Sequence, residues 1–153
     1  LESNLKLTET DMTIFFRGLA DLPKELVVPE KDDLSFLDSV KNAFYKIEEM
    51  KGETLWFWKD WFGQYATRLQ KEKLSDGDRK QKMNLINPKY VLRNYMSQIA
   101  IDAADKGDYS IIEELYNLLK KPYDEQSDYD KWFAKRPEWA RTKVGCSMLS
   151  CSS

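Results

Sequence analysis

The sequence predicts an all-α fold, a compact helical bundle of about five to six helices with an irregular aromatic segment and a mobile C-terminal tail. Apolar residues recur at three- and four-residue steps along most of the 153 residues, as they do on the buried face of an amphipathic helix. Capping residues, prolines and glycines mark the ends of several of these segments. The alternation of apolar and polar residues that is typical of a strand is almost absent.

The first predicted helix covers residues 10–22. Thr10 can cap its N-terminus through the hydroxyl group, and Pro23 ends it. The second predicted helix follows a pair of aspartates and extends to Gly52. The apolar stripes of the two helices are Met12, Phe15, Phe16 and Leu19, and then Leu34, Leu37, Val40, Phe44 and Ile47.

The third predicted helix, residues 53–73, carries a heavy aromatic load. Trp58, Trp61 and Tyr65 share one of its faces. We favour packing in a core for this set, because each ring removes a large apolar area from water. Stacking of the rings on a nucleobase stays open as the alternative.

Positive charge gathers after this helix, around the turn at residues 75–78. The favoured interpretation is a solvated helix end and loop. Contact with a phosphate or an acidic partner stays open as the alternative. The six basic residues are Arg68, Lys71, Lys73, Arg79, Lys80 and Lys82, and the three acidic residues are Glu72, Asp76 and Asp78.

The clearest local signal is Asn87-Pro88, which predicts the start of a helix with Asn87 as the cap and Pro88 at the first helical position. Gly107 predicts the end of this helix. The stripe between these signals consists of Leu92, Tyr95, Met96, Ile99 and Ala103, and Ala100 permits the close approach of a neighbouring element.

Asp108 or Ser110 starts the last long predicted helix, which ends before Pro122. It buries Ile111, Ile112, Leu115, Leu118 and Leu119. Residues 123–140 mix acidic and aromatic side chains and predict a short helix plus an irregular segment laid over the bundle.

No internal repeat or low-complexity linker divides the chain, so we expect one helical domain over residues 1–140. Residues 141–153 are small and polar, and they predict a flexible Ser/Cys tail. The chain starts at Leu1 without a methionine, and we expect it to be a piece of a longer polypeptide.

The composition excludes several classes of function. The formal net charge of −2 provides no general attraction to anions, so we expect no nucleic acid and no membrane among the partners. No segment approaches the roughly 20 apolar residues of a spanning helix. The absence of histidine removes Ser-His and Cys-His catalytic pairs and imidazole-based zinc sites. Two cysteines are too few for a zinc site made of thiolates alone, and we expect no metal site.

Nucleotide-binding motifs are also missing from the chain. Its six glycines are isolated, and no Gly-rich loop could hold a triphosphate. We therefore expect no cofactor in this chain. Two pairs of carboxylates, Asp102 with Asp105 and Glu113 with Glu114, lie off the apolar stripes or at their edges. Solvation at the surface is favoured over acid–base catalysis for both pairs.

Lys89 and Arg93 lie four residues apart on one face of the helix predicted after Pro88. Two interpretations stay open. The first is surface charge whose aliphatic stems pack on neighbouring side chains. The second is a core-docking or anion contact with a carboxylate or phosphate from elsewhere in a larger protein.

Cys151 is the residue that we expect to perform chemistry. It is third from the end of the Ser-rich tail, and an accessible thiol can attack another group or form a disulfide. Cys146 is the candidate partner for such a disulfide, and an inert tail is the alternative. Two cysteines do not make the framework of a secreted domain, which favours a reducing compartment.

The order and spacing of several blocks resemble the C-terminal region of the selenoprotein O (SelO/YdiU) family. The blocks are Asn87-Pro88-Lys89-Tyr90-Val91-Leu92-Arg93-Asn94-Tyr95, Gln98, Ala100, Ala103-Ala104, Lys106-Gly107-Asp108, Pro122-Tyr123, Pro137-Glu138-Trp139-Ala140 and Cys151-Ser152-Ser153. Upstream, Asp11-Met12-Thr13 with Phe15-Phe16-Arg17 and Trp58-Lys59-Asp60-Trp61 with Tyr65 and Arg68-Leu69 resemble two further helices of the family.

The resemblance implies a kinase-like protein that transfers AMP from ATP, with Mg²⁺ or Mn²⁺, to hydroxyl-bearing side chains of other proteins. The nucleotide and metal residues of that family lie upstream, so the resemblance assigns no catalytic residue here and implies that this chain alone is inactive. It implies two partners, the upstream kinase-like core and the protein substrates. It also implies a bacterial cytoplasmic or a mitochondrial location. Because some animal members have selenocysteine at the position of Cys151, it implies a redox role for the tail.

A second hypothesis stands beside this resemblance. The chain could be an independent helical module that binds a protein partner and has no catalytic role. Its binding groove would be formed by the aromatic residues Trp132, Phe133 and Trp139.

Overall fold

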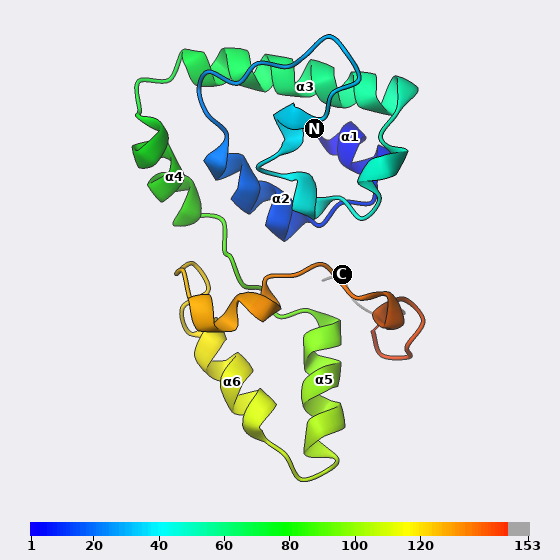
Figure 1. Ribbon diagram of the computed structural model, residues 1–153. Coiled ribbons are helices and arrows are strands. Elements are labelled where there is room, and N and C mark those ends of the chain that lie inside the picture. The colour runs from blue at the N-terminus through cyan, green and yellow to red at the C-terminus, as the bar shows by residue number, and fades with distance from the viewer. Residues whose placement is uncertain (147–153) are drawn as a thin grey trace. The chain divides into compact units, whose positions relative to one another are not determined.

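Six α-helices and several short 3-10 turns make up residues 1–146, the part of the chain that the computed structural model describes (Figure 1). These residues contain no strand, only one isolated bridge between Thr10 and Phe44. The predicted all-α class is therefore confirmed. The chain divides into unit 1, Leu1–Asn87, and unit 2, which starts at Pro88.

The helices of unit 1 are α1 (Glu2–Leu7), α2 (Met12–Gly18), α3 (Gly52–Gln70) and α4 (Asp76–Asn84), and those of unit 2 are α5 (Asn94–Ala104) and α6 (Ser110–Leu119). The 3-10 turns are Leu19–Asp21, Ser35–Leu37, Lys41–Ala43, Ile47–Glu49, Ser127–Trp132 and Glu138–Arg141. No helix within residues 1–146 has the length and apolarity needed to cross a bilayer.

The core of unit 1 is built on the aromatic face of α3. Trp58 and Phe62 lie one turn apart on this helix and have no exposed surface. The ring of Phe15 on α2 lies 5.5 Å from Trp58 and 6.5 Å from Phe62, measured between ring centroids. Such tilted and edge-to-face pairs add a favourable quadrupole interaction to the burial of apolar area. The predicted core role of Trp58 is confirmed.

Residues 34–51 do not form the predicted second helix, although its predicted apolar positions are buried or half-buried. Three successive 3-10 turns bury them, because a three-residue step suits a 3-10 turn as well as an α-helix. The backbone N–H of Asp11 donates to Ala43 O at 2.8 Å, and the N–H of Tyr45 donates to Glu9 O at 3.0 Å. These two bonds hold Phe44 in an extended conformation that no helix can include.

The starts of two helices in unit 1 also differ from the prediction. Asp11, rather than Thr10, caps α2, and its carboxylate accepts the N–H of Ile14 at 3.1 Å. The charged stretch around residues 75–78, interpreted as a solvated helix end and loop, instead starts α4. Its cap is Ser75, whose hydroxyl oxygen accepts an N–H from the first turn at 3.0 Å.

The helix predicted to start at Pro88 begins six residues later, at Asn94. The N–H groups of Lys89 and Tyr90 both donate to the carbonyl oxygen of Pro122, at 2.8 and 3.1 Å. Because a distant carbonyl satisfies these donors, residues 88–93 follow an irregular path instead of a helical one.

The turn between α5 and α6 agrees with the sequence signals, whereas Ile112 on α6, which was predicted to be buried, is 45% exposed. Gly107 follows α5 with a φ of +81°, a left-handed conformation that favours glycine, and the N–H of Asp108 donates to Ala103 O at 3.1 Å. The Asp108 carboxylate accepts the N–H of Ser110 at 2.9 Å, where α6 begins. The hydrophobic core of unit 2 contains Tyr90, Tyr95, Met96, Ala100, Leu115, Leu118, Trp132, Ala140 and Cys146.

Truncation of the α3 core face should destabilise unit 1. We expect Trp58→Ala to lower the free energy of unfolding by about 3–5 kcal/mol, because it leaves a large cavity among packed rings. Trp56 on the same helix is 60% exposed. The matched control Trp56→Ala should cost less than about 1 kcal/mol. Urea titrations followed by circular dichroism measure both values, and equal losses would contradict the assignment of the core face.

Candidate functional site

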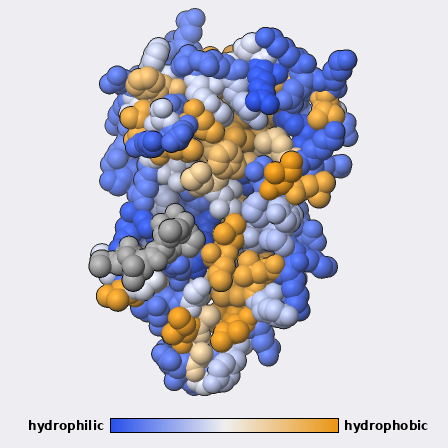
Figure 2. Space-filling view, turned by 180° about the vertical axis from the view of Figure 1, so that it is seen from behind, coloured by the Kyte–Doolittle hydropathy of each residue, from blue (hydrophilic) through white to orange (hydrophobic). Residues whose placement is uncertain are grey.

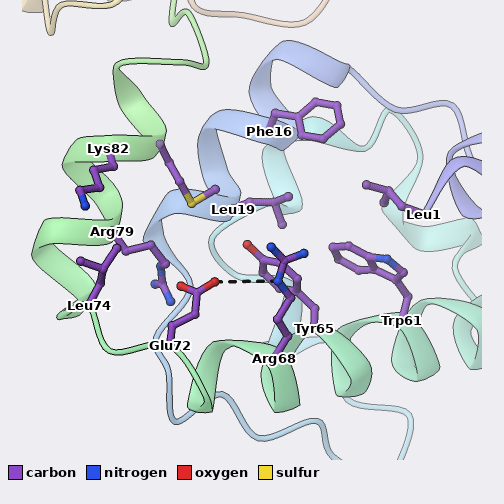
Figure 3. A pocket seen from close by; sticks show the side chains of 11 residues that line it. Leu1, Phe16, Leu19, Trp61, Tyr65, Arg68, Glu72, Leu74, Arg79 and Lys82 are labelled. Carbon is purple, nitrogen blue, oxygen red and sulfur yellow. Dashed lines mark ion pairs between the residues drawn. The ribbon is translucent and has the colours of Figure 1, made fainter.

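Unit 1 contains a pocket of about 660 Å³ between α2, α3 and α4 (Figure 3). Its volume lies within the range of small-ligand sites, which is roughly 300–1,000 Å³. The apolar lining residues are Leu1, Phe16, Leu19, Trp61, Tyr65, Leu74 and Met83, and the charged ones are Arg68, Glu72, Arg79 and Lys82. Apolar walls with a few charged groups are typical of a ligand site.

A stacked aromatic pair forms one wall of this pocket. Trp61 and Tyr65 lie one turn apart on α3, with ring centroids 5.1 Å apart and an angle of 11° between the ring planes. Burial raises the pKa of Tyr65, although the positive charges of Arg79 and Arg68 act to lower it. The phenol is therefore neutral at pH 7, and its hydroxyl can both donate and accept a hydrogen bond.

Arg79 provides the buried charge of the pocket and is 3% exposed. Its Nη2 donates to the carbonyl oxygen of Leu22 and lies 3.3 Å from Asp76 Oδ1. Its Nε and Nη1 are buried and have no hydrogen-bond partner among the described residues. In Figure 3 its side chain runs from α4 toward Glu72 at the end of α3. Glu72 in turn lies 3.9 Å from Arg68 Nε.

The structure separates the predicted pair Lys89 and Arg93 from any helix face, because both precede α5. Lys89 is buried, and its Nζ contacts Glu125 Oε2 at 2.8 Å and Asp130 Oδ1 at 2.6 Å. Arg93 Nη1 donates to the carbonyl oxygen of Ala134 at 3.0 Å. The expectation of a shared helix face is wrong. A docking or anion contact with another part of a larger protein stays a prediction.

The surroundings of Lys89 keep it charged. Burial acts to lower its pKa, but hydrogen bonds with Asp130, Glu125 and Tyr90 outweigh burial and raise the pKa above its usual range. The same bond from Lys89 lowers the pKa of Asp130. The hydroxyl of Tyr90 also donates to the carbonyl oxygen of Gln126 at 2.9 Å. These contacts hold the segment after α6 against residues 88–93.

The two predicted redox residues differ in what the structure describes. Cys146 is a free cysteine in the core of unit 2, with 2% of its surface exposed. Cys151 lies outside the described residues 1–146, so the pairing of these cysteines stays a prediction. In the described conformation, Cys146 is almost completely shielded from solvent.

The predicted division into a domain, residues 1–140, and a tail, residues 141–153, also stays a prediction.

The carboxylate pairs do not form a catalytic cleft. Glu114 accepts a hydrogen bond from Trp132 Nε1 at 2.6 Å and lies 2.6 Å from Lys131 Nζ. Burial acts to raise its pKa, but these two partners outweigh burial and lower it. Asp102 pairs with Lys143, which lowers its pKa. Within residues 1–146, no three acidic or thiol side chains come together as a metal site.

Known proteins resemble the whole of this chain. It is 64% identical over 153 residues to the protein nucleotidyltransferase YdiU of Flavobacterium johnsoniae, and it spans 28% of that protein. The resemblance to the SelO/YdiU family is confirmed. The chain is also 48% identical over 145 residues to YdiU of Methylobacillus flagellatus and 46% identical over 156 residues to YdiU of Rhodopirellula baltica. The alignments cover 95% and 97% of the chain, and 26% and 28% of those YdiU proteins. No family model matches the sequence.

The sequence did not predict the pocket of unit 1. The aromatic set of α3 and the positive charge after α3 were recognised only as separate features. The burial of Arg79 gives no local signal, because α4 is strongly polar and its neighbours in the sequence are charged. A helix cap at Ser75 is the one signal that could have placed α4 beside the end of α3.

Unit 2 should lose stability in acid through Asp130. Its pKa in the folded state is lower than the ordinary 3.8, so its contribution is complete above the ordinary pKa and is lost as pH falls through the folded value. We expect the stability advantage of the wild type over Asp130→Asn to be full near about pH 6 and to shrink below about pH 4. Urea titrations at several pH values measure this difference.

Asp128→Asn is the matched control, because Asp128 is exposed on the same 3-10 turn. An advantage over Asp130→Asn that stays constant between those pH values would contradict the ion pair with Lys89.

The thiol of Cys146 should resist modification while unit 2 is folded. In the variant Cys151→Ser, where Cys146 is the one remaining cysteine, we expect a thiol reagent such as Ellman's reagent to react far more slowly than with free cysteine. Addition of urea should restore the ordinary rate. Rapid modification of the folded variant would show that Cys146 is accessible.

Proposed function

We propose that this chain is the C-terminal helical region of a SelO/YdiU-type protein nucleotidyltransferase. The observation that carries the proposal is the 64% identity along the whole chain with a protein of that name, of which the chain spans 28%. In this proposal the full-length protein transfers AMP from ATP to serine, threonine or tyrosine hydroxyls of other proteins. The partners of this chain are then the upstream kinase-like core of the same protein and the protein substrates.

The residues of this chain do not fit an ATP–metal complex. No Gly-rich phosphate loop occurs in the sequence, and residues 1–146 bring no three metal-ligating side chains together. We place ATP and the Mg²⁺ or Mn²⁺ ion in the remaining part of the full-length protein. In that case the role of this chain is to pack on the catalytic core, and the chain alone has no transfer activity.

Exposed apolar side chains support a packing role. Figure 2 shows apolar patches on a largely hydrophilic surface. Leu85 and Ile86 are about three-quarters exposed, and Ile101 on α5 is half exposed. Adjacent exposed apolar side chains, such as Leu85 and Ile86, form a candidate contact surface. The catalytic core is the partner that we assign to them.

The location and the redox role are parts of the same proposal. The relatives named above are bacterial, which supports a bacterial cytoplasmic protein and gives no support to a mitochondrial one. We assign the redox chemistry to Cys151. Its pairing with Cys146 requires the buried thiol to leave the core of unit 2.

The alternative function, an independent interaction module, receives less support. Its groove needs Trp132 on an open surface, but Trp132 is buried and bonded to Glu114. Trp139, at 42% exposure, is the more accessible of the two tryptophans.

AMP transfer tests the proposal directly. We expect the longer protein to label acceptor proteins when it is incubated with Mn²⁺ and ATP labelled at the α-phosphate, whereas the 153-residue chain should label none. ATP labelled at the γ-phosphate is the control, because its label is lost when AMP is transferred. Transfer by this chain alone, or transfer of the γ-label by the longer protein, would contradict the proposal.

A further inference from the structure

The guanidinium of Arg79 is buried with only part of its hydrogen-bonding capacity used. Nη2 contacts Leu22 and Asp76, whereas Nε and Nη1 have no partner among the described residues. A buried donor without a partner costs about 1–3 kcal/mol, and more when it is charged. A side chain in this state, lining a pocket, indicates that a ligand group completes its hydrogen bonds.

The charge of the pocket defines the sign of that group. Three lining residues are cationic, Arg68, Arg79 and Lys82, and one is anionic, Glu72. Arg68 lies 3.9 Å from Glu72 and Arg79 lies 3.3 Å from Asp76, so each of these two cations has one acidic neighbour. Arg79 differs because its Nε and Nη1 are buried without a hydrogen-bond partner among the described residues. A guanidinium binds the oxygens of a carboxylate or phosphate in a planar geometry that suits both.

The aromatic wall of the pocket indicates the apolar part of the ligand. Trp61 and Tyr65 stack on each other and are only half-buried, and Phe16 and Leu19 continue the apolar lining. In Figure 3, Trp61 and Tyr65 extend from α3 into the pocket, and Arg79 extends into it from α4 on the other side of Glu72. An aromatic wall of this kind binds planar rings.

We propose that the pocket of unit 1 binds a small organic anion in which a planar ring is joined to a carboxylate or phosphate. The ring contacts Trp61 and Tyr65, and the anionic oxygens accept hydrogen bonds from Arg79 Nε and Nη1. This site is independent of the proposed ATP site, which lies outside the chain. A bare inorganic anion would use Arg79 but leave the apolar wall unfilled.

Calorimetric titration of the 153-residue chain with phenyl phosphate, benzoate, benzyl alcohol and inorganic phosphate tests the proposal. We expect phenyl phosphate or benzoate, or both, to bind at least about tenfold more tightly than benzyl alcohol and than inorganic phosphate. The tighter of the two ring compounds identifies the anionic group. Absence of binding by both, or equal binding of inorganic phosphate, would overturn the proposal.

Variants and contacts locate the site. Arg79→Met and Trp61→Leu should each weaken binding about tenfold or more. Lys71→Gln, which removes an exposed positive charge near the pocket but outside its lining, should leave binding unchanged. Because Arg79→Met could unfold α4, nuclear Overhauser effects between the ring protons of the bound compound and the Trp61 indole of the wild type provide an independent measurement. Unchanged affinity in folded Arg79→Met, or Overhauser contacts elsewhere only, would overturn the assignment.

Discussion

Trp58 and Phe62 on α3 enclose the ring of Phe15, and the rest of unit 1 forms around this contact. Apart from α3, the elements of unit 1 are short helices and 3-10 turns, which have little stability of their own in water. They become ordered by burying apolar side chains against α3. The ring centroid of Phe44 lies 5.2 Å from that of Trp58, and the ring centroid of Phe36 lies 5.4 Å from that of Phe62. The same helix presents Trp61 and Tyr65 on an adjoining face. The position of the pocket therefore depends on the packing of the core.

The sequence predicted those elements whose signals are local. The long apolar face of α3 and the hairpin of α5 and α6, with its turn at Gly107, follow from periodicity and from the ends of helices. It failed where a distant backbone group decides the conformation. Residues 34–51 have an apolar spacing that suits a helix, but their backbone bonds to Glu9 and Asp11 impose another path. The Asn87-Pro88 signal fails for a related reason, because the carbonyl of Pro122 takes the N–H groups that a helix would have used.

The candidate sites show the same division. The sequence shows the positive charge after α3 and the helical spacing of Trp61 and Tyr65. It does not show that Arg79 of α4 lines the same pocket as these two rings. That arrangement depends on the packing of α4 against the turn Leu19–Asp21 and on the hydrogen bond from Arg79 to Leu22. Lys89 contacts two carboxylates, but both belong to its own unit, so the predicted docking or anion contact with another part of a larger protein stays a prediction.

Lys89, Arg93 and Cys146 act on the same segment of unit 2. Lys89 holds Glu125 and Asp130, Arg93 holds the carbonyl of Ala134, and Cys146 buries its thiol in the core that this segment covers. A disulfide to Cys146 therefore has to overcome the packing of its buried side chain. The contacts that order this segment thus oppose a redox role for Cys146, whereas the proposed redox role of Cys151 lies outside the described residues.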